Sequence, residues 1–212
     1  MSETHKDQLE ALAEIRHLME RSSRFLSLSG LSGVFAGIYA LIGAGAAYWQ
    51  LKANVYDTQR YAALQSSEKA MLKFLMFFFI DAALVLLLTL LTAIYFTTQK
   101  ASEKGQSIFD KTALRLAAHL FFPLGVGGIF CIALLNYGLF GLMAPSMLIF
   151  YGLGLINASN FTFENVRYLG LAEVTLGLIS AFITGYGLFF WSIGFGFFHI
   201  VYGVYMYLKF EK

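Results

Sequence analysis

Four ionisable side chains lie inside the long apolar stretches of this sequence, at Asp81, His119, Glu173 and His199. A charged group at the depth of a lipid bilayer is costly, so each of these residues needs a structural or a functional reason. Carboxyl and imidazole groups in such places carry protons, bind cations or contact ligands. These four residues are therefore the candidates for an intramembrane polar site.

The expected depths of the four residues differ. Asp81 lies seven residues into its expected helix, about 10 Å from the outer end at 1.5 Å per residue, and His199 lies near the middle of the last helix. His119 and Glu173 are expected within about 8 Å of the cytoplasmic ends of their helices, where the nearby interface lowers the cost of a charge. We therefore expect Asp81 and His199 to be the more informative pair.

Each candidate has a functional and a structural interpretation. Asp81 is either a proton- or cation-handling carboxylate that faces a polar cavity, or a carboxyl group paired with a hydroxyl, tyrosine or histidine inside the bundle. His199 is either a ligand contact, a proton relay or a cofactor ligand, or else a core histidine with satisfied hydrogen bonds, which we favour. Glu173, near the positive end of a helix dipole, is sufficiently explained as an interface residue.

The patterns that mark common enzymes and cofactor sites are absent from the sequence. There is no Gly-x-Ser-x-Gly, no His-Glu-x-x-His and no phosphate-binding glycine-rich loop followed by lysine. Haem ligation by two histidines needs matching depth, whereas His119 is expected several turns nearer the cytoplasm than His199. No spacing of His, Cys and Glu resembles a metal site, and the single cysteine, Cys131, has no intrachain disulfide partner. We expect a non-enzymatic protein without a cofactor or a metal.

Two uncharged runs indicate the fold class, an all-α polytopic membrane protein. Neither the stretch from Leu116 to Phe163 nor that from Val174 to Leu208 contains Asp, Glu, Lys or Arg. A spanning helix needs about 20 apolar residues, so the first run must cross the membrane twice and fold back at Asn136-Tyr137-Gly138. The composition agrees, with 58% hydrophobic and 13% charged residues and a mean hydropathy of +0.66.

These runs belong to a larger arrangement of six expected spanning helices, which form three hairpins in residues 25–212. The helices are expected at about 25–49, 74–97, 116–135, 139–156, 168–184 and 188–208. Residues 1–24 precede them as an amphipathic cytoplasmic or interfacial helix, whose narrow apolar stripe consists of Leu9, Leu12, Ile15 and Leu18. The turns of the second and third hairpins both read Tyr-Gly-Leu-Phe, at 137–140 and 186–189, which hints at a tandem repeat.

The distribution of basic residues predicts the orientation. Most of the 15 Lys and Arg residues fall in the N-terminal segment, in the second and fourth connections and at the C-terminus. Because Lys and Arg concentrate on the cytoplasmic side of a membrane, both termini are expected in the cytoplasm. The net charge of +2 is too small to suggest a nucleic-acid surface.

Glycines mark the expected helix contacts. Gly30, Gly33 and Gly37 share one face of the first spanning helix, and small residues let membrane helices approach closely. We favour packing within one chain over a dimer face. A partner protein or a second copy, bound through this face or through the N-terminal helix, is the alternative.

Two segments resemble a family of uncharacterised bacterial inner-membrane proteins. One is EIRHLMERSSRFLSLSGLSG at residues 14–33, and the other is HIVYGVYMYLKFE at residues 199–211. The resemblance implies a multi-pass protein of the bacterial inner membrane with six helices. It implies no activity, because no function is assigned to the group.

Two functions remain open from the sequence. The first is an interaction, regulatory or assembly subunit of a membrane complex, favoured by the amphipathic N-terminal helix, the small-residue faces and the shortage of polar groups at mid-depth. The second is a small proton-coupled transporter or channel that uses Asp81 and His199. A structure discriminates between them by showing whether these two side chains face one cavity, each other or lipid.

Overall fold

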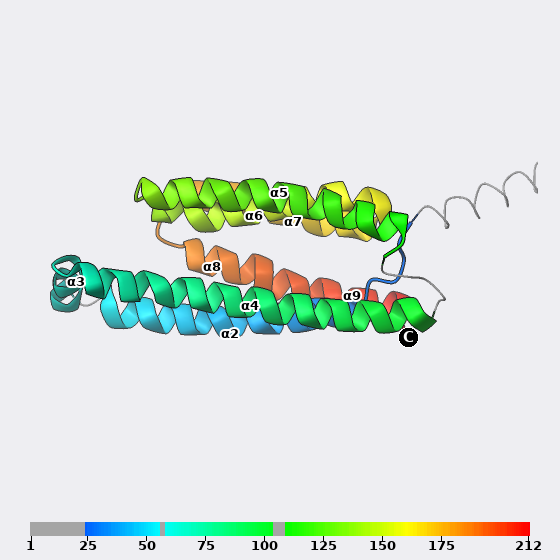
Figure 1. Ribbon diagram of the computed structural model, residues 1–212, viewed down its shortest axis with the longest axis horizontal. Helices are drawn as coiled ribbons and strands as arrows, with labels where there is room; N and C mark the ends of the chain where they lie inside the picture. Colours follow the sequence, from blue (N-terminus) through cyan, green and yellow to red (C-terminus); the bar gives the residue numbers. More distant parts are fainter. Residues whose placement is uncertain (1–23, 56–57, 104–108) are drawn as a thin grey trace, which may run out of the picture.

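The computed structural model describes residues 24–55, 58–103 and 109–212, and all regular structure in these ranges is helical (Figure 1). The α-helices are α2 (Gly30–Asn54), α3 (Thr58–Gln65), α4 (Glu68–Glu103), α5 (Lys111–Asn136), α6 (Met143–Ala158), α7 (Asn165–Phe182), α8 (Gly187–Trp191) and α9 (His199–Phe210). Short 3₁₀ segments, Phe140–Leu142 and Ser159–Phe161, flank α6, and a π-helix, Ser192–Phe198, joins α8 to α9. The expected all-α class is confirmed for these ranges, whereas the expected amphipathic helix lies outside them except for Arg24.

Among the described residues, five helical segments are long and apolar enough to cross a membrane. They are Gly30–Asn54, Glu68–Glu103, Lys111–Asn136, Phe140–Phe161 and Gly187–Phe210. α7, with 18 residues, is not among them, because Arg167 and Glu173 lower the hydropathy of a short helix. α4 continues beyond the expected bounds at both ends, where Glu, Lys and Ala residues favour the helix.

The chain reverses direction at two glycine turns. Gly138 has a φ angle of 70° and Gly185 a φ angle of 90°, in the left-handed region that favours glycine. At the first turn the backbone N–H of Leu139 donates to Leu134 O at 2.8 Å, which closes the end of α5. Both turns lie where the sequence places the tips of the second and third hairpins.

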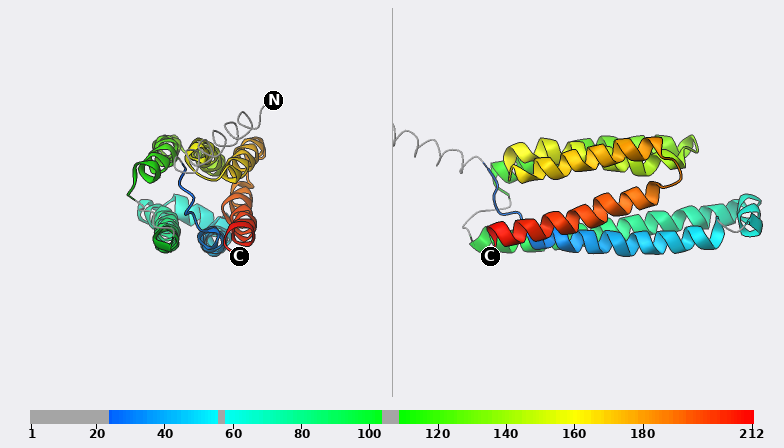
Figure 2. Two further views of the ribbon diagram at one scale, coloured as in Figure 1. Left: turned by 90° about the vertical axis from the view of Figure 1, so that its right-hand side faces the viewer. Right: turned by 180° about the vertical axis from the view of Figure 1, so that it is seen from behind.

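The helices form two layers (Figures 1 and 2). One layer contains α5, α6 and α7, and the other contains α4, α2 and α9. The expected third hairpin does not pack along its length: α7 lies along α6, whereas the last helix begins against α6 at α8 and ends against α2 at α9. The two helices after the second hairpin therefore diverge and connect the layers.

Glycine contacts explain this divergence. A Cβ atom on Gly170 would lie 2.7 Å from Gly152 O, so the backbones of α7 and α6 touch. Between α2 and α9, a Cβ atom on Gly203 would lie 2.6 Å from Gly30 O, and one on Gly33 would lie 3.2 Å from Gly203 Cα. The glycine face of α2, which includes Gly37 opposite the π-helix, thus packs against the last helix of the same chain.

Hydrogen bonds tie the two layers together at the end of the bundle where the C-terminus lies. The backbone N–H of Phe25 donates to Phe161 O at 2.7 Å, and the hydroxyl of Thr162 donates to Phe25 O at 2.7 Å. Thr162 is completely buried, and Phe25 packs against Ala101 and Ala113. The segment before α2 is therefore fastened to the loop between α6 and α7.

A second tie at this end joins Lys100 of α4 to Glu211 beyond α9. Lys100 Nζ donates to Glu211 Oε1 at 2.7 Å and to Leu28 O at 2.9 Å. Glu211 also accepts hydrogen bonds from the backbone N–H of Gly30, at 2.5 Å, and from the Ser29 hydroxyl. The carboxylate thus caps the N-terminus of α2, where the helix dipole favours a negative charge. Partial burial raises the pKa of Glu211, but these hydrogen bonds and the Lys100 charge outweigh it, so the pKa lies below its ordinary value.

Candidate functional site

Glu173 is the most deeply buried ionisable group in the described part of the chain. α7 begins at Asn165, before the expected start, so Glu173 lies about 12 Å along the helix and not near its positive end. The residue has 0% relative exposure, and neither carboxyl oxygen has a hydrogen-bond partner among the described residues. Its position therefore differs from the interface position that the sequence suggested.

His199 lies beside this carboxyl group and joins three helices. Its Nε2 is 2.7 Å from the Tyr151 hydroxyl of α6, and its Nδ1 is 3.0 Å from Gly194 O in the π-helix. The same Nδ1 is 3.5 Å from Glu173 Oε1 of α7. The imidazole thus has one hydrogen-bond partner at each nitrogen and faces the carboxyl group as well.

The π-helix shapes the site at Gly194. π-helical turns are rare and occur frequently at functional sites. Here the π-helix ends immediately before His199 and presents the carbonyl of Gly194 to the imidazole. A Cβ atom on Gly194 would collide with Glu173 Oε2 and with the side chain of Leu148. Glycine at this position therefore makes room for the buried carboxyl group.

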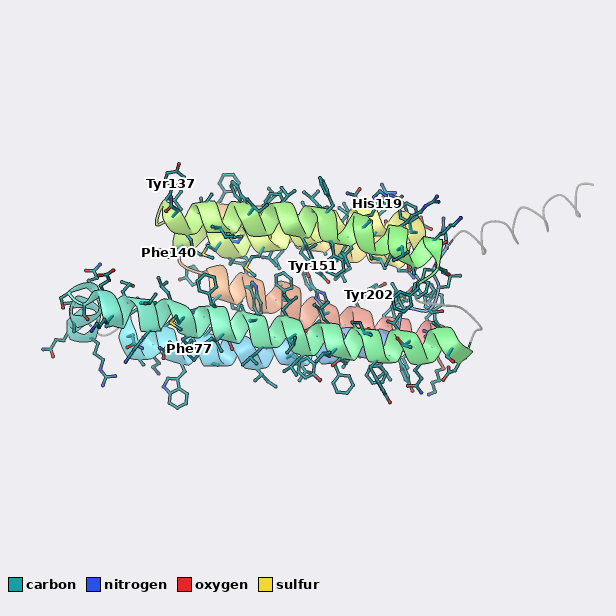
Figure 3. All side chains as sticks on the ribbon, viewed as in Figure 1. Phe77, His119, Tyr137, Phe140, Tyr151 and Tyr202 are labelled. Carbon is teal, nitrogen blue, oxygen red and sulfur yellow. The ribbon has the colours of Figure 1, made fainter. Side chains whose placement is uncertain are left out.

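Aromatic rings surround the polar groups. The ring centroids of Trp191 and Phe195 are 5.0 Å apart, as are those of Phe195 and Tyr151, and the Tyr151 ring lies 5.3 Å from the His199 ring. Figure 3 shows Tyr151 between the two helical layers, with Tyr202 nearer the C-terminal end. This packing places the imidazole in a low-dielectric environment, where electrostatic interactions are stronger than in water.

The site can share a proton. If one proton serves the carboxyl and imidazole groups together, the pair is neutral overall, either as a carboxylic acid with an imidazole or as a carboxylate with an imidazolium. Neutrality as a pair avoids the large cost of an isolated buried charge. At 3.5 Å the two groups are within reach of proton transfer after a small movement.

The structure brings together Glu173 and His199 but not Asp81. Asp81 lies in the contact between α4 and α2, where a Cβ atom on Gly43 would be 3.3 Å from its Oδ2. Within the described ranges Asp81 has no hydrogen bond or ion pair to another residue. His119 is exposed on α5 and stacks on Phe161, with ring centroids 4.6 Å apart. Neither residue contributes to the Glu173–His199 site.

Tyr151 and Gly194 belong to the site but were not among the four candidate residues of the sequence. Tyr151-Gly152 and Tyr202-Gly203 are matching dipeptides in the second and third hairpins, and both tyrosines pack against the core cluster around Met206. The repeated Tyr-Gly dipeptide is the only sequence pattern that marks Tyr151. Nothing local distinguishes Gly194 from the other 19 of the 20 glycines, because its role depends on a side chain of another helix.

Among the residues with described positions, no three His, Cys, Asp or Glu side chains are placed to hold a metal ion. Comparison with known proteins finds no matching family model, no matching curated protein and no matching solved structure. The resemblance to uncharacterised bacterial inner-membrane proteins therefore stays a prediction, and the function is argued from the site.

Proposed function

We propose that this chain is a multi-pass protein of the bacterial inner membrane, with both termini in the cytoplasm, and that its Glu173–His199–Tyr151 site carries protons for transport across the membrane. The five long apolar helices, with α7 packed along α6 as a sixth crossing, and the many exposed apolar side chains support the membrane location. The basic residues at the end of the bundle near the C-terminus support the orientation. Glu173 takes the place that Asp81 had in the sequence-based hypothesis.

The burial of Glu173 without a hydrogen bond carries this proposal. An unsatisfied buried polar group costs about 1–3 kcal/mol, and Glu173 has two such oxygens. A purely structural position would favour an apolar side chain of similar size, which avoids this cost. An ionisable group kept at such a position is by default a functional one, and the neighbouring imidazole gives it a proton-transfer partner.

The geometry supports a relay through two tautomers of His199. In one tautomer Nδ1–H donates to Gly194 O, and Nε2 accepts from the Tyr151 hydroxyl. In the other, Nε2–H donates to the Tyr151 oxygen, and Nδ1 accepts a hydrogen bond from the protonated Glu173 carboxyl group. When Glu173 gives its proton to Nδ1, Nε2 releases its own proton to Tyr151, whose hydroxyl proton passes onward. One proton moves through the imidazole, which is left with its proton on Nδ1. Its return to the Nε2–H tautomer completes the cycle before Glu173 passes on the next proton.

A vesicle assay tests the proposal. The purified protein is reconstituted in vesicles that contain a pH-sensitive dye, and an inside-negative potential is applied with potassium and valinomycin. We expect proton influx above the rate of empty vesicles, and we expect Glu173→Gln to reduce the influx to that of empty vesicles. Glu164→Gln, an exposed glutamate next to the same helix, is the matched control and should keep the wild-type rate. A wild-type rate equal to that of empty vesicles, or an unaffected Glu173→Gln variant, contradicts the proposal.

A membrane-complex subunit is the second candidate, favoured by the exposure of α4. The most apolar stretch of α4 contains no buried residue, although α4 is the longest helix described. Lipid accounts for part of this surface, and a partner protein or a second copy is the alternative occupant. In a Cys131→Ser background, Leu87→Cys and Leu91→Cys should each cross-link to the bound partner or second copy and give a product of discrete mass. Ile132→Cys, at an exposed position of α5, should not. Equal labelling of both helices without a discrete product argues against a partner on α4.

A further inference from the structure

Four buried side-chain atoms have no hydrogen-bond partner within the described part of the chain. They are the two carboxyl oxygens of Glu173, the hydroxyl of Ser180 and the hydroxyl of Tyr202. Buried polar groups in native proteins are nearly always paired, so each exception needs an explanation. All four atoms belong to α7 and α9, the two helices that supply Glu173 and His199.

Ser180 extends the site toward the Gly185 turn. It follows Glu173 by seven residues, which places it on the same face of α7 and about 10.5 Å along the axis. Its side chain is almost completely buried, at 1% exposure. The hydroxyls of Ser146 and Ser192 donate to the carbonyl four residues earlier, as helical serines commonly do. The hydroxyl of Ser180 makes no such bond, so it is available to another group.

Tyr202 extends the site toward the other end of the bundle. It follows His199 by three residues, about 4.5 Å along α9. Figure 3 shows Tyr151 and Tyr202 in the space between the two layers, and both rings pack against the same buried cluster around Met206. The buried hydroxyl of Tyr202 thus belongs to a residue about one helical turn from His199, on its C-terminal side.

We infer that these groups form one proton route where α7 and the last helix face α6, with Ser180 as its outer step and Tyr202 as its inner step. This inference rests on the proposed function. α7 and the last helix run in opposite directions from the Gly185 turn (Figure 2), so the order along the bundle is Ser180, Glu173, His199 with Tyr151, and then Tyr202. The titratable groups that face the route are Tyr151 from α6, Glu173 from α7, and His199 and Tyr202 from the last helix.

Hydroxyl groups suit both end steps of such a route. A hydroxyl accepts a proton at its lone pair and releases its own proton to the next acceptor, so it returns to its starting form. The axial separation of Ser180 and Glu173 exceeds the span of one bridging water, so the outer step of the route requires a chain of ordered waters between the two side chains. A proton that arrives at Ser180 is thus passed through water to the Glu173 carboxylate, and the proton that leaves His199 is passed by way of Tyr151 toward Tyr202.

The vesicle assay tests the route with variants that remove only the hydroxyls. We expect Ser180→Ala and Tyr202→Phe each to reduce proton influx by about tenfold or more, because proton-transfer groups typically contribute that much. The matched controls are Ser146→Ala, a buried serine whose hydroxyl bonds its own helix, and Tyr205→Phe, whose exposed ring carries a hydroxyl bonded to Lys209. Both controls should keep the wild-type rate.

The outcomes separate the route from the function itself. A wild-type rate in either hydroxyl variant, together with loss of influx in Glu173→Gln, overturns the route and leaves the proposed function standing. A wild-type rate in Glu173→Gln overturns both. A second measurement covers variants that fold poorly: in a Cys131→Ser background, Ser180→Cys should react with a small water-soluble thiol reagent. Absence of that reaction overturns a water-filled route, with Asn160→Cys, at an exposed position between α6 and α7, as the reactive control.

Discussion

Removal of the Glu211 carboxylate should destabilise the bundle at the end where the C-terminus lies. Glu211→Gln weakens three hydrogen bonds, from Lys100 Nζ, from the backbone N–H of Gly30 and from the Ser29 hydroxyl. It also leaves the ammonium group of Lys100, whose side chain is only 10% exposed, without its counter-charge.

The expected magnitude follows from these contacts. A hydrogen bond to a charged group contributes about 1.5–3 kcal/mol, and loss of one partner of a buried ion pair costs about 3–5 kcal/mol. Because solvent screens part of the interaction, we expect a loss of about 2–3 kcal/mol in the free energy of unfolding. The Lys100→Met/Glu211→Gln double variant should lose less than the sum of the single losses.

Lowering the pH should also destabilise the unsubstituted protein, because it protonates the Glu211 carboxylate. The pKa of Glu211 in the folded chain lies below its unfolded value of 4.5, so its ionised form stabilises the fold above the unfolded pKa. This contribution should be lost as the pH falls through the lower, folded pKa. Thermal unfolding of the detergent-solubilised protein, followed by circular dichroism as a function of pH, measures the effect. An unchanged pH dependence and unfolding midpoint in Glu211→Gln would contradict a stabilising role of the Lys100–Glu211 ion pair. So would a double variant whose loss of stability equals the sum of the losses in the two single variants.

Four further substitutions test the packing and the site. Gly194→Ala should destabilise the fold by about 1–3 kcal/mol and abolish proton influx, because its Cβ would occupy the space of the Glu173 carboxyl group; thermal unfolding and the vesicle assay measure the two effects. Gly170→Val should likewise lower the unfolding midpoint by forcing α7 away from α6, whereas Gly45→Ala, which faces open space, should raise stability by about 0.5–1 kcal/mol. Tyr151→Phe should cost about 1–3 kcal/mol by leaving the imidazole Nε2 without a partner, with a lower influx rate; an unchanged rate argues against the relay.

The sequence predicted the helices well because the signal is local. An uncharged run that is too long for one crossing must fold back, and a glycine near its middle supplies the left-handed turn, as Gly138 does. The pairing of helices was not predictable in the same way. A glycine face such as that around Gly33 indicates close packing but does not identify the helix that fills it, and here the partner is α9, far along the chain.

The site was predicted by residue type but not by arrangement. Glu173 and His199 were identified because ionisable groups are conspicuous in apolar stretches. Depth estimates then favoured Asp81 over Glu173, because the helix was expected to begin after Arg167, whereas α7 includes Arg167 and begins at Asn165. Depth also says nothing about lateral position, and Asp81 lies against α2 while His199 faces α6 and α7.

The tie between Lys100 and Glu211 had no sequence signal at all. Its two residues are 111 positions apart, and each reads as an ordinary charge near a helix end. Only the antiparallel packing of α4 against α2, and of α2 against α9, brings them to the same end of the bundle. Such contacts follow from the completed fold and not from any local pattern.

Infrared difference spectroscopy tests the central claim most directly, because it observes the proton on the carboxyl group. Spectra of the reconstituted protein are recorded across a pH series, and carbon-13 labelling of glutamate distinguishes its carboxyl band from that of aspartate. We predict a pH-dependent band of a protonated glutamate that is absent in Glu173→Gln and unchanged in Asp81→Asn. A band that survives Glu173→Gln, or that disappears in Asp81→Asn, would contradict the assignment of the proton site to Glu173.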